Sequence, residues 1–173
     1  MPEIVMIACA AKNDVIGNGP EIPWNIKEEF GHFVELTMGS PCVMGDVTYE
    51  SLPSSAKPLP GRENIVLTLL PDYEPDDVTL FRDFDEAMEY VRGLDVDRAF
   101  ICGGGSIYRL GMELADTLEL TRLDRDYEGN VFFPEVDPAR WRLDRAESAS
   151  GVDRNSGETV SFEYQTWRRV SSG

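Results

Sequence analysis

The chain has 173 residues, a length that fits one domain with its own hydrophobic core. Its 32 acidic and 16 basic residues leave a formal net charge of −16, which makes nucleic acid and anionic membranes poor partners. No apolar run approaches the roughly 18 residues that a membrane helix needs, and the N-terminus shows no signal peptide, so we expect no membrane segment.

The acidic residues are spread over the whole chain instead of forming one acidic tail. A spread excess indicates adaptation of the whole surface, and we interpret it as a sign of a halophilic protein from a salt-rich cytoplasm. At an ionic strength of 1 M, counterions screen such charges beyond a Debye length of roughly 3 Å. An ordinary acidic protein is the alternative, and its melting temperature would not depend on salt.

The three cysteines, an odd number scattered along the chain, do not form a disulfide framework. Cys9, Cys42 and Cys102 each lie in an apolar run, which predicts buried, reduced thiols in a cytoplasmic protein. The sequence has no metal-ligand spacing, so we expect no metal site. Its only histidine, His32, is expected to be a plain surface or half-buried residue.

Strand and helix patterns alternate along most of the chain. In chain order, we expect a buried strand at 4–11, a turn-rich loop at 12–20, a helix at 26–38, a strand at 41–45, a short helix at 46–52, a proline-rich loop at 53–63, strands at 64–70 and 78–81, a helix at 83–92, a strand at 98–102, a short helix at 106–110 and a strand at 117–124. Two final strands, about 141–149 and 159–170, flank a turn at 153–157. This order predicts an α/β fold with a mainly parallel sheet and an antiparallel edge.

An acid stands on the apolar face of the first expected helix. Glu29 shares that face with Phe33 and Leu36, because residues three and four apart are neighbours on a helix. Apolar surroundings remove water from a carboxyl group and raise its pKa, so such an acid indicates a ligand or chemistry that offsets the cost. The alternative is that Glu29 lies at the edge of the apolar face and reaches water, as its neighbour Glu28 does.

Two junctions between a strand and a helix carry glycine. The run 103–105 of three glycines, followed by Ser106, could hold phosphate with backbone N–H groups, although a tight turn is the alternative. Its spacing matches neither the dinucleotide fingerprint nor a Walker loop. Gly45 marks the second junction, and two junctions at the carboxyl edge of a parallel sheet could clasp the pyrophosphate of a dinucleotide.

One arginine follows a stiff proline-rich loop. Arg62 could hold a ligand carboxylate with two parallel hydrogen bonds, or it could pair with a local acid of this acidic chain.

Taken together, these segments resemble the dihydrofolate reductases over about residues 4 to 168. The matching motifs occur in the family's order and spacing: Val15-Ile16-Gly17, Pro23-Trp24-Asn25, Glu29, Gly45-x-x-Thr48-Tyr49-Glu50-Ser51, Pro58-Leu59-Pro60-Gly61-Arg62-x-Asn64, Gly103-Gly104-Gly105-x-Ile107-Tyr108, Leu120-Thr121 and Phe133-Pro134. The resemblance implies one domain over 1–173, with an eight-stranded, mostly parallel sheet, an antiparallel C-terminal edge strand and helices on both faces. It also implies reduction of 7,8-dihydrofolate to tetrahydrofolate by NADPH. Hydride would pass from nicotinamide C4 to pterin C6, and a proton would reach N5.

The resemblance also implies roles for individual residues. Glu29 would grip the 2-amino and N3 side of the pterin, and a water near Trp24 would help to deliver the proton. Arg62 would clamp the glutamate α-carboxylate of the substrate. The residues implied in catalysis are Glu29, Trp24, Thr121 and Tyr108, and those implied in substrate binding are Cys9, Glu29, Phe30, Phe33, Leu36, Leu59, Arg62 and Thr121. The residues implied in cofactor binding are Ala8, Cys9, Ile16, Gly17, Gly45, Asp46, Val47, Thr48, Thr68, Leu69, Arg82, Cys102, Gly103, Gly104, Gly105, Ser106, Ile107 and Tyr108.

Two structural details follow from the same resemblance. The Gly103–Gly104 peptide is expected to be cis, and the loop 18–22 is expected to close over the nicotinamide and exclude water. Asn130 stands where some relatives have Asp, so the coupling of this loop is expected to differ. A monomer is expected.

The chain departs from the family where the adenosine 2′-phosphate would bind. Asp46 occupies a position that is often basic, and Leu69 one that is often Ser or Thr, while Thr68 and Arg82 are possible substitutes. An aspartate would repel the phosphate, so we expect NADPH to be the cofactor with a weaker or salt-dependent preference over NADH.

Two other functions remain open at this point. The related reductase of riboflavin synthesis shares the fold and the cofactor, but its substrate has no glutamate tail for Arg62. A non-catalytic nucleotide-binding protein would have no reason to retain both Glu29 and Arg62.

Overall fold

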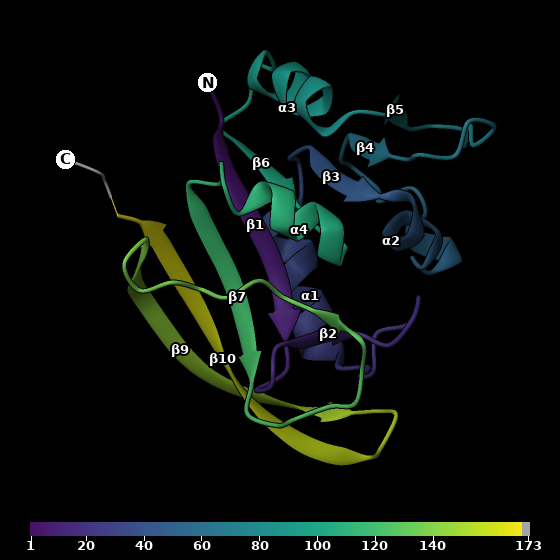
Figure 1. Cartoon of the computed structure of the whole chain (residues 1–173). Helices are drawn as coiled ribbons and strands as arrows, with labels where there is room; N and C mark the ends of the chain where they lie inside the picture. Colours follow the sequence, from purple (N-terminus) through teal and green to yellow (C-terminus); the bar gives the residue numbers. More distant parts are fainter. Residues whose placement is uncertain (171–173) are drawn as a thin grey trace.

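The computed structural model describes residues 1–170 and contains an eight-stranded sheet in the order β5-β4-β3-β6-β1-β7-β10-β9 (Figure 1). Its strands are β1 Glu3–Ala10, β3 Cys42–Gly45, β4 Asn64–Leu67, β5 Thr79–Phe81, β6 Arg98–Ile101, β7 Thr117–Leu123, β9 Trp141–Asp153 and β10 Glu158–Arg169. The pairs from β5 to β7 are all parallel, whereas β10 runs antiparallel to both β7 and β9. The expected α/β fold is confirmed, and the antiparallel strand β10 lies one place inside the edge strand β9.

The helices cover both faces of this sheet: α4 lies in front of β1 in Figure 1, and α1 lies behind it. Their bounds are α1 Lys27–Thr37, α2 Asp46–Glu50, α3 Phe84–Arg92 and α4 Gly105–Gly111, with a 3₁₀ turn at Ser54–Ala56. Strand β1 shows why both faces need a cover. Met6 and Ala8 belong to the core under α3 and α4, whereas Val5 and Ile7 pack on the opposite face with Phe33 of α1.

Several element boundaries differ from those expected. Strand β4 ends at Leu67 instead of residue 70, because the Thr68 hydroxyl accepts a hydrogen bond from the Leu70 N–H and turns the chain away. Leu69 is 89% exposed, so apolar character did not indicate burial there. Asp83 is not helical but caps α3, since its carboxylate accepts a hydrogen bond from the Glu86 N–H.

Two further features were not expected. Strand β9 extends to Asp153, past the predicted end at 149, because its ladder with β10 continues to the turn. A small second sheet pairs β2, Val15–Gly17, with β8, Val131–Phe132. Both of its strands are too short to show a periodic pattern.

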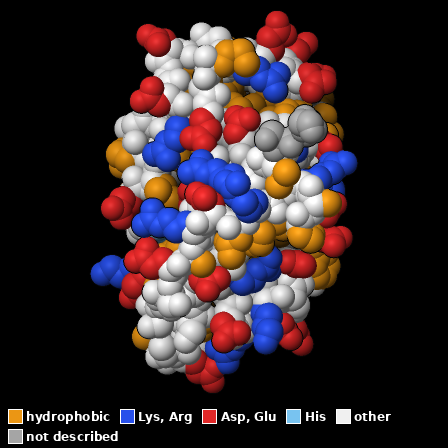
Figure 2. Space-filling view, turned by 90° about the vertical axis from the view of Figure 1, so that its left-hand side faces the viewer, with side chains coloured by type: hydrophobic (Ala, Val, Ile, Leu, Met, Phe, Trp, Pro, Cys, Tyr) orange, Lys and Arg blue, Asp and Glu red, His pale blue; other side chains and the backbone are white. Residues whose placement is uncertain are grey.

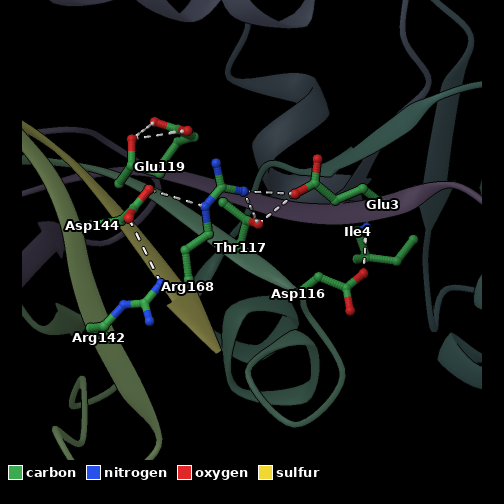
Figure 3. A network of polar contacts seen from close by, with 9 residues as sticks. Glu3, Ile4, Asp116, Thr117, Glu119, Arg142, Asp144 and Arg168 are labelled. Atoms are coloured by element: carbon green, nitrogen blue, oxygen red, sulfur yellow. Dashed lines mark hydrogen bonds and ion pairs between the residues drawn. The ribbon is translucent and has the colours of Figure 1, made fainter. Parts of the chain in front are cut away.

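At the end of the sheet that carries the N-terminus, one arginine connects four strands (Figure 3). The Arg168 guanidinium of β10 donates hydrogen bonds to the Glu3 carboxylate of β1 and the Thr117 hydroxyl of β7, both at 3.0 Å, and lies 3.5 Å from the Asp144 carboxylate of β9. Figure 2 shows a face on which basic side chains are interspersed with acidic ones.

No helix among residues 1–170 is long and apolar enough to cross a membrane. Within the same residues, no group of three or more His, Cys, Asp or Glu side chains could hold a metal ion.

Candidate functional site

The expected site residues meet where the parallel strands β1, β3, β6 and β7 reach their carboxyl ends. Cys9 near the end of β1 is in register with Thr121 of β7, and the Gly45 N–H at the end of β3 donates a hydrogen bond to the Gly103 carbonyl at 2.9 Å. The carboxyl edge of an α/β sheet is where ligands bind, so the fold brings the candidate residues to the edge that suits them.

Glu29 lies in the first turn of α1 and faces the sheet. The residue is partly buried, and its carboxyl group is the desolvated part, because burial raises its pKa to about 7 while a hydrogen bond from Thr121 opposes the rise. Its neighbour Glu28 is exposed. The prediction that Glu29 faces inward is therefore confirmed. Glu28, and not Glu29, reaches water at the edge of the apolar face.

Three ionisable groups face the Glu29 carboxyl from three different strands or helices. Burial raises the pKa of Cys9 on β1, of Tyr108 on α4 and of Tyr164 on β10, and the charge of Glu29 raises each of them further. The Tyr108 hydroxyl is held by a 2.7 Å hydrogen bond to the Ile7 carbonyl. Since all three groups stay neutral near pH 7, Glu29 is the group in this cluster that titrates there.

Trp24 closes the site on the side of the loop that precedes α1. Trp24 is 7% exposed, its indole packs edge-on against Tyr127 with ring centroids 5.0 Å apart, and it lies in one hydrophobic cluster with Cys9. On α1, the half-buried His32 stacks on Tyr164 of β10, with the ring centroids 3.9 Å apart.

Arg62 is held ready for an external acid. Its guanidinium donates to the Pro60 carbonyl and the Thr37 hydroxyl, both at 2.9 Å, and no carboxylate among residues 1–170 forms an ion pair with it. The buried Asn64 holds the same loop by exchanging hydrogen bonds with both backbone groups of Leu59, at 2.8 and 3.1 Å. The alternative, in which Arg62 pairs with a local acid, is therefore wrong for the described residues.

Apolar side chains lie along α1 beside Glu29 and across from it. Phe30 is 42% exposed, Phe33 and Leu36 are half-buried, and Leu59 is almost fully buried in the core that they cover. An exposed phenylalanine next to a desolvated acid provides an apolar surface for a flat ring.

The two glycine junctions are packed against each other. A side chain at Gly103 or Gly104 would come into close contact with neighbouring residues. The Gly103–Gly104 peptide is cis, which confirms that expectation, and Gly103 has a φ of +112° that side chains rarely adopt. A Cβ added there would lie 3.1 Å from the Tyr108 ring, and one added at Gly104 would lie 3.3 Å from the Thr48 hydroxyl. Side chains at these two positions would therefore crowd Tyr108 and Thr48.

The position of Asp46 shows how its charge is stabilised. Its carboxylate accepts hydrogen bonds from the Thr68 hydroxyl and the Val47 N–H, both at 2.7 Å. The guanidinium of Arg82 instead donates to three backbone carbonyls of the loop 70–73, at 2.9 to 3.3 Å. The Thr68 hydroxyl is thus bonded to Asp46, and the Arg82 guanidinium is bonded to backbone carbonyls. Their expected role as substitutes at the 2′-phosphate stays a prediction.

The remaining candidates for cofactor binding divide by exposure. Ala8, Gly17, Gly105 and Ile107 are buried, Ile16 and Cys102 are half-buried, and Val47 and Ser106 are exposed. The loop that carries residues 18–22 is tied to Asn130, whose side-chain oxygen accepts from the Gly19 N–H at 2.8 Å and whose N–H donates to the Gly17 carbonyl at 3.0 Å. An asparagine therefore couples this loop to the rest of the chain.

Two residues near the site were not among the candidates. Asp153 is 1% exposed and accepts a 2.8 Å hydrogen bond from the Tyr127 hydroxyl, the same residue that packs on Trp24. The sequence places Asp153 in a turn-rich segment, where an aspartate is ordinary, and no local pattern links it to Trp24.

The doubly covered sheet thus places the paired glycine junctions and the desolvated acid at its carboxyl edge, where α/β proteins bind their ligands. A profile of the family described as dihydrofolate reductase matches residues 3–169. The chain belongs to the dihydrofolate reductase family.

Individual relatives agree with this assignment. The chain is 40% identical over 156 residues to a dihydrofolate reductase of Neisseria gonorrhoeae, covering 88% of this chain and 94% of the relative. It is 34% identical over 158 residues to a dihydrofolate reductase of Mycobacterium tuberculosis, with the same shares covered. It also resembles the solved dihydrofolate reductase from Enterococcus faecalis complexed with NADP(H) and RAB-propyl, with a TM-score of 0.82, 26% identity and coverage of 98% and 97% of the two chains.

Proposed function

We propose that the chain catalyses the NADPH-dependent reduction of 7,8-dihydrofolate to 5,6,7,8-tetrahydrofolate. The observation that carries this proposal is the Glu29 carboxyl, desolvated among neutral groups at the carboxyl edge of the sheet, with a pKa of about 7. Such a group is half protonated near neutral pH, which suits an acid that must provide a proton in each turnover. Family membership of residues 3–169 supports the reaction.

Glu29 binds the pterin and holds the proton. When it is ionised, its two carboxyl oxygens would accept from the 2-amino group and the N3 side of the ring, and a water near Trp24 would deliver the proton to N5. Thr121 orients the carboxyl, and Trp24 with Cys9 keeps bulk water from it. Phe30 and Phe33 provide the apolar surface on which the pterin and benzoyl rings lie.

Arg62 binds the glutamate α-carboxylate at the other end of the substrate. Because Thr37 and the Pro60 carbonyl hold the guanidinium and no described acid pairs with it, a carboxylate can bind without displacing an ion pair. This arrangement argues against the alternative substrate of riboflavin synthesis, which has no glutamate tail.

The glycine junctions fit NADPH, because backbone without side chains at the carboxyl edge of the sheet lets phosphate approach the N–H groups closely, and Tyr108 and Thr48 leave no room for a Cβ at Gly103 or Gly104. The bound cofactor supplies the hydride to pterin C6. Gly45, Thr48, Gly104, Gly105 and Ser106 would surround its phosphates, and the backbone of Cys9 and Ile16 would hold the carboxamide. The loop 18–22 excludes water from the nicotinamide.

Substitution of Glu29 by glutamine tests this function. Glu29→Gln removes the titrating proton, so we expect kcat/KM for dihydrofolate to fall about a hundredfold or more, with NADPH binding retained. In the unaltered protein, kcat/KM should decrease as the pH rises through about 7, since the protonated form is the active one. The variant should lose this pH dependence.

The exposed neighbour provides the matched control, because Glu28→Gln removes an equal charge one residue away and should leave turnover unchanged. Full dihydrofolate turnover by Glu29→Gln would contradict the proposed function.

The setting of the enzyme is part of the same proposal. We assign the chain one domain, a monomeric state and a cytoplasmic location. The three free cysteines support the location, because reduced thiols are typical of the cytoplasm. A salt-rich cytoplasm is supported by the net charge of −16.

A further inference from the structure

The turn between β9 and β10 contains a buried acid with no role in the proposed chemistry. The Asp153 carboxylate accepts hydrogen bonds from the Asn25 N–H at 3.0 Å, the Tyr127 hydroxyl at 2.8 Å and the Asn155 N–H at 3.0 Å. Burial raises the pKa of Asp153, but these hydrogen bonds outweigh burial and leave the pKa below its usual value. The group is therefore a fixed negative charge at neutral pH.

The same turn grips the segment 23–26 at several points. The Arg154 N–H donates to the Asn25 carbonyl and its guanidinium to the Asn25 side-chain oxygen, both at 2.9 Å. The Asn155 side chain donates to the Pro23 carbonyl at 3.1 Å, and Ile26 forms a bridge with Asp153. The residues on both sides of Trp24 are thus tied to the hairpin.

Tyr127 connects this turn to the Trp24 ring itself. Its hydroxyl donates to Asp153, while its ring packs edge-on against the Trp24 indole at 5.0 Å. The indole in turn belongs to the same hydrophobic cluster as Tyr127 and Cys9, and the charge of Glu29 acts on the Cys9 thiol. One series of contacts therefore runs from the hairpin through Trp24 to Cys9, which faces Glu29.

We propose that Asp153 and Tyr127 are positioning residues for the reduction, because they hold the Trp24 indole against Cys9 and thereby keep water from the Glu29 carboxyl. This inference depends on the proposed role of Glu29. Neither residue is among the substrate contacts proposed above. Tyr127 lies outside the ladder between β9 and β10, and Asp153 takes part in that ladder through its backbone, so its carboxylate remains for Asn25 and Tyr127.

The environment of Glu29 makes the proposal testable through pH. Besides Thr121, the groups that face its carboxyl are Cys9, Tyr108 and Tyr164, all neutral near pH 7. Charged groups lie farther out: Arg122 acts on Cys9, and Glu28 and Glu147 act on Tyr164. A change in the pH profile near neutrality therefore reports how well Glu29 is shielded from water.

The decisive variant is Tyr127→Phe, which keeps the ring on Trp24 and removes only the hydrogen bond to Asp153. Asp153→Asn is the second variant, which keeps the shape and removes the charge. For each we expect kcat/KM for dihydrofolate to fall between about fivefold and fiftyfold, because a buried polar group loses its partner. The apparent pKa of the pH profile should fall by about half a unit or more, because water reaches Glu29. The dissociation constant for NADPH should not change.

Tyr90→Phe is the matched control. It removes another tyrosine hydroxyl that donates to a carboxylate, that of Glu63, and it lies on α3 away from this turn. Its kcat/KM and pH profile should equal those of the unaltered protein. A Tyr127→Phe variant with the same kcat/KM and pH profile as the control would overturn the proposal. A lowered melting temperature with an unchanged pH profile would also overturn the proposal, because it would show that Tyr127 and Asp153 only stabilise the fold.

A second readout does not need turnover. The fluorescence of Trp24, obtained as the difference between each protein and its Trp24→Phe counterpart, should titrate with Glu29, and the midpoint should fall in Tyr127→Phe. Failure of the unaltered protein to reduce dihydrofolate would reject the proposed function, while this titration would still decide the role of Tyr127. An unshifted midpoint would overturn the inference.

Discussion

Asp46 and Arg62 show how differently single charged residues can be prepared for a ligand. Arg62 has its hydrogen bonds to neutral partners, so its positive charge is available. Asp46 already accepts hydrogen bonds from the Thr68 hydroxyl and the Val47 N–H, so a negative charge is fixed at the start of α2. A 2′-phosphate bound close to this carboxylate would be repelled, whereas a ribose hydroxyl could donate to it.

Asparagine at position 46 tests this difference. Asp46→Asn removes the charge and retains an oxygen for Thr68, so we expect the ratio of kcat/KM for NADPH to that for NADH to rise about fivefold to tenfold at low salt. The rise should shrink at high KCl because salt screens the repulsion. Asp95→Asn, at an exposed position after α3, provides the control with an equal change of charge. An unaltered ratio in Asp46→Asn would show that Asp46 does not influence the choice of cofactor.

At the same residue scale, the site was only partly predictable. Glu29 could be found because its helical spacing to Phe33 and Leu36 marks an inward-facing acid in one short segment. Asp153 could not, because its partners Asn25 and Tyr127 are distant in sequence and meet it only when the hairpin folds back on the sheet. Periodicity reports which face of an element is buried and carries no information about such long-range pairs.

Strands were predictable where burial alone defines them. β1 and β6 are apolar after their first residue, and the sequence predicts both. The predicted β4 is too long because Leu69 and Leu70 are apolar but exposed. β2 and β8 were missed because two or three residues show no period. The element whose sequence was least informative is β9: it is mostly exposed, and charged residues occupy much of its length.

Charged side chains on β9 and β10 also stabilise the sheet, and Arg168 is the clearest case. Arg168→Ala removes contacts to β1, β7 and β9 together, and since the groups are partly exposed we expect a loss of about 1 kcal/mol in the free energy of unfolding. Urea unfolding measures this loss. Arg145→Ala, which removes one exposed pair with Glu147, should change the free energy by a few tenths of a kcal/mol at most. Equal losses in both variants would mean that the connection between strands contributes nothing.

Over the whole molecule, acidic groups without basic partners dominate the surface. The chain has 32 acidic residues, and only a minority of them form ion pairs within the described structure. The fold places these carboxylates on exposed loops, helix faces and the β9 strand, so their repulsion acts across the entire folded surface.

Screening of this repulsion should make stability depend on salt. Between 0.1 M and 1 M KCl the Debye length falls from about 10 Å to about 3 Å, so we expect the melting temperature near pH 7 to rise steadily over this range. Near the isoelectric point of about 4.3, the net charge vanishes and the same series should give a much smaller rise. A melting temperature that is independent of KCl at pH 7 would reject the salt-adapted interpretation. Equal rises at both pH values would attribute the effect to something other than the acidic surface.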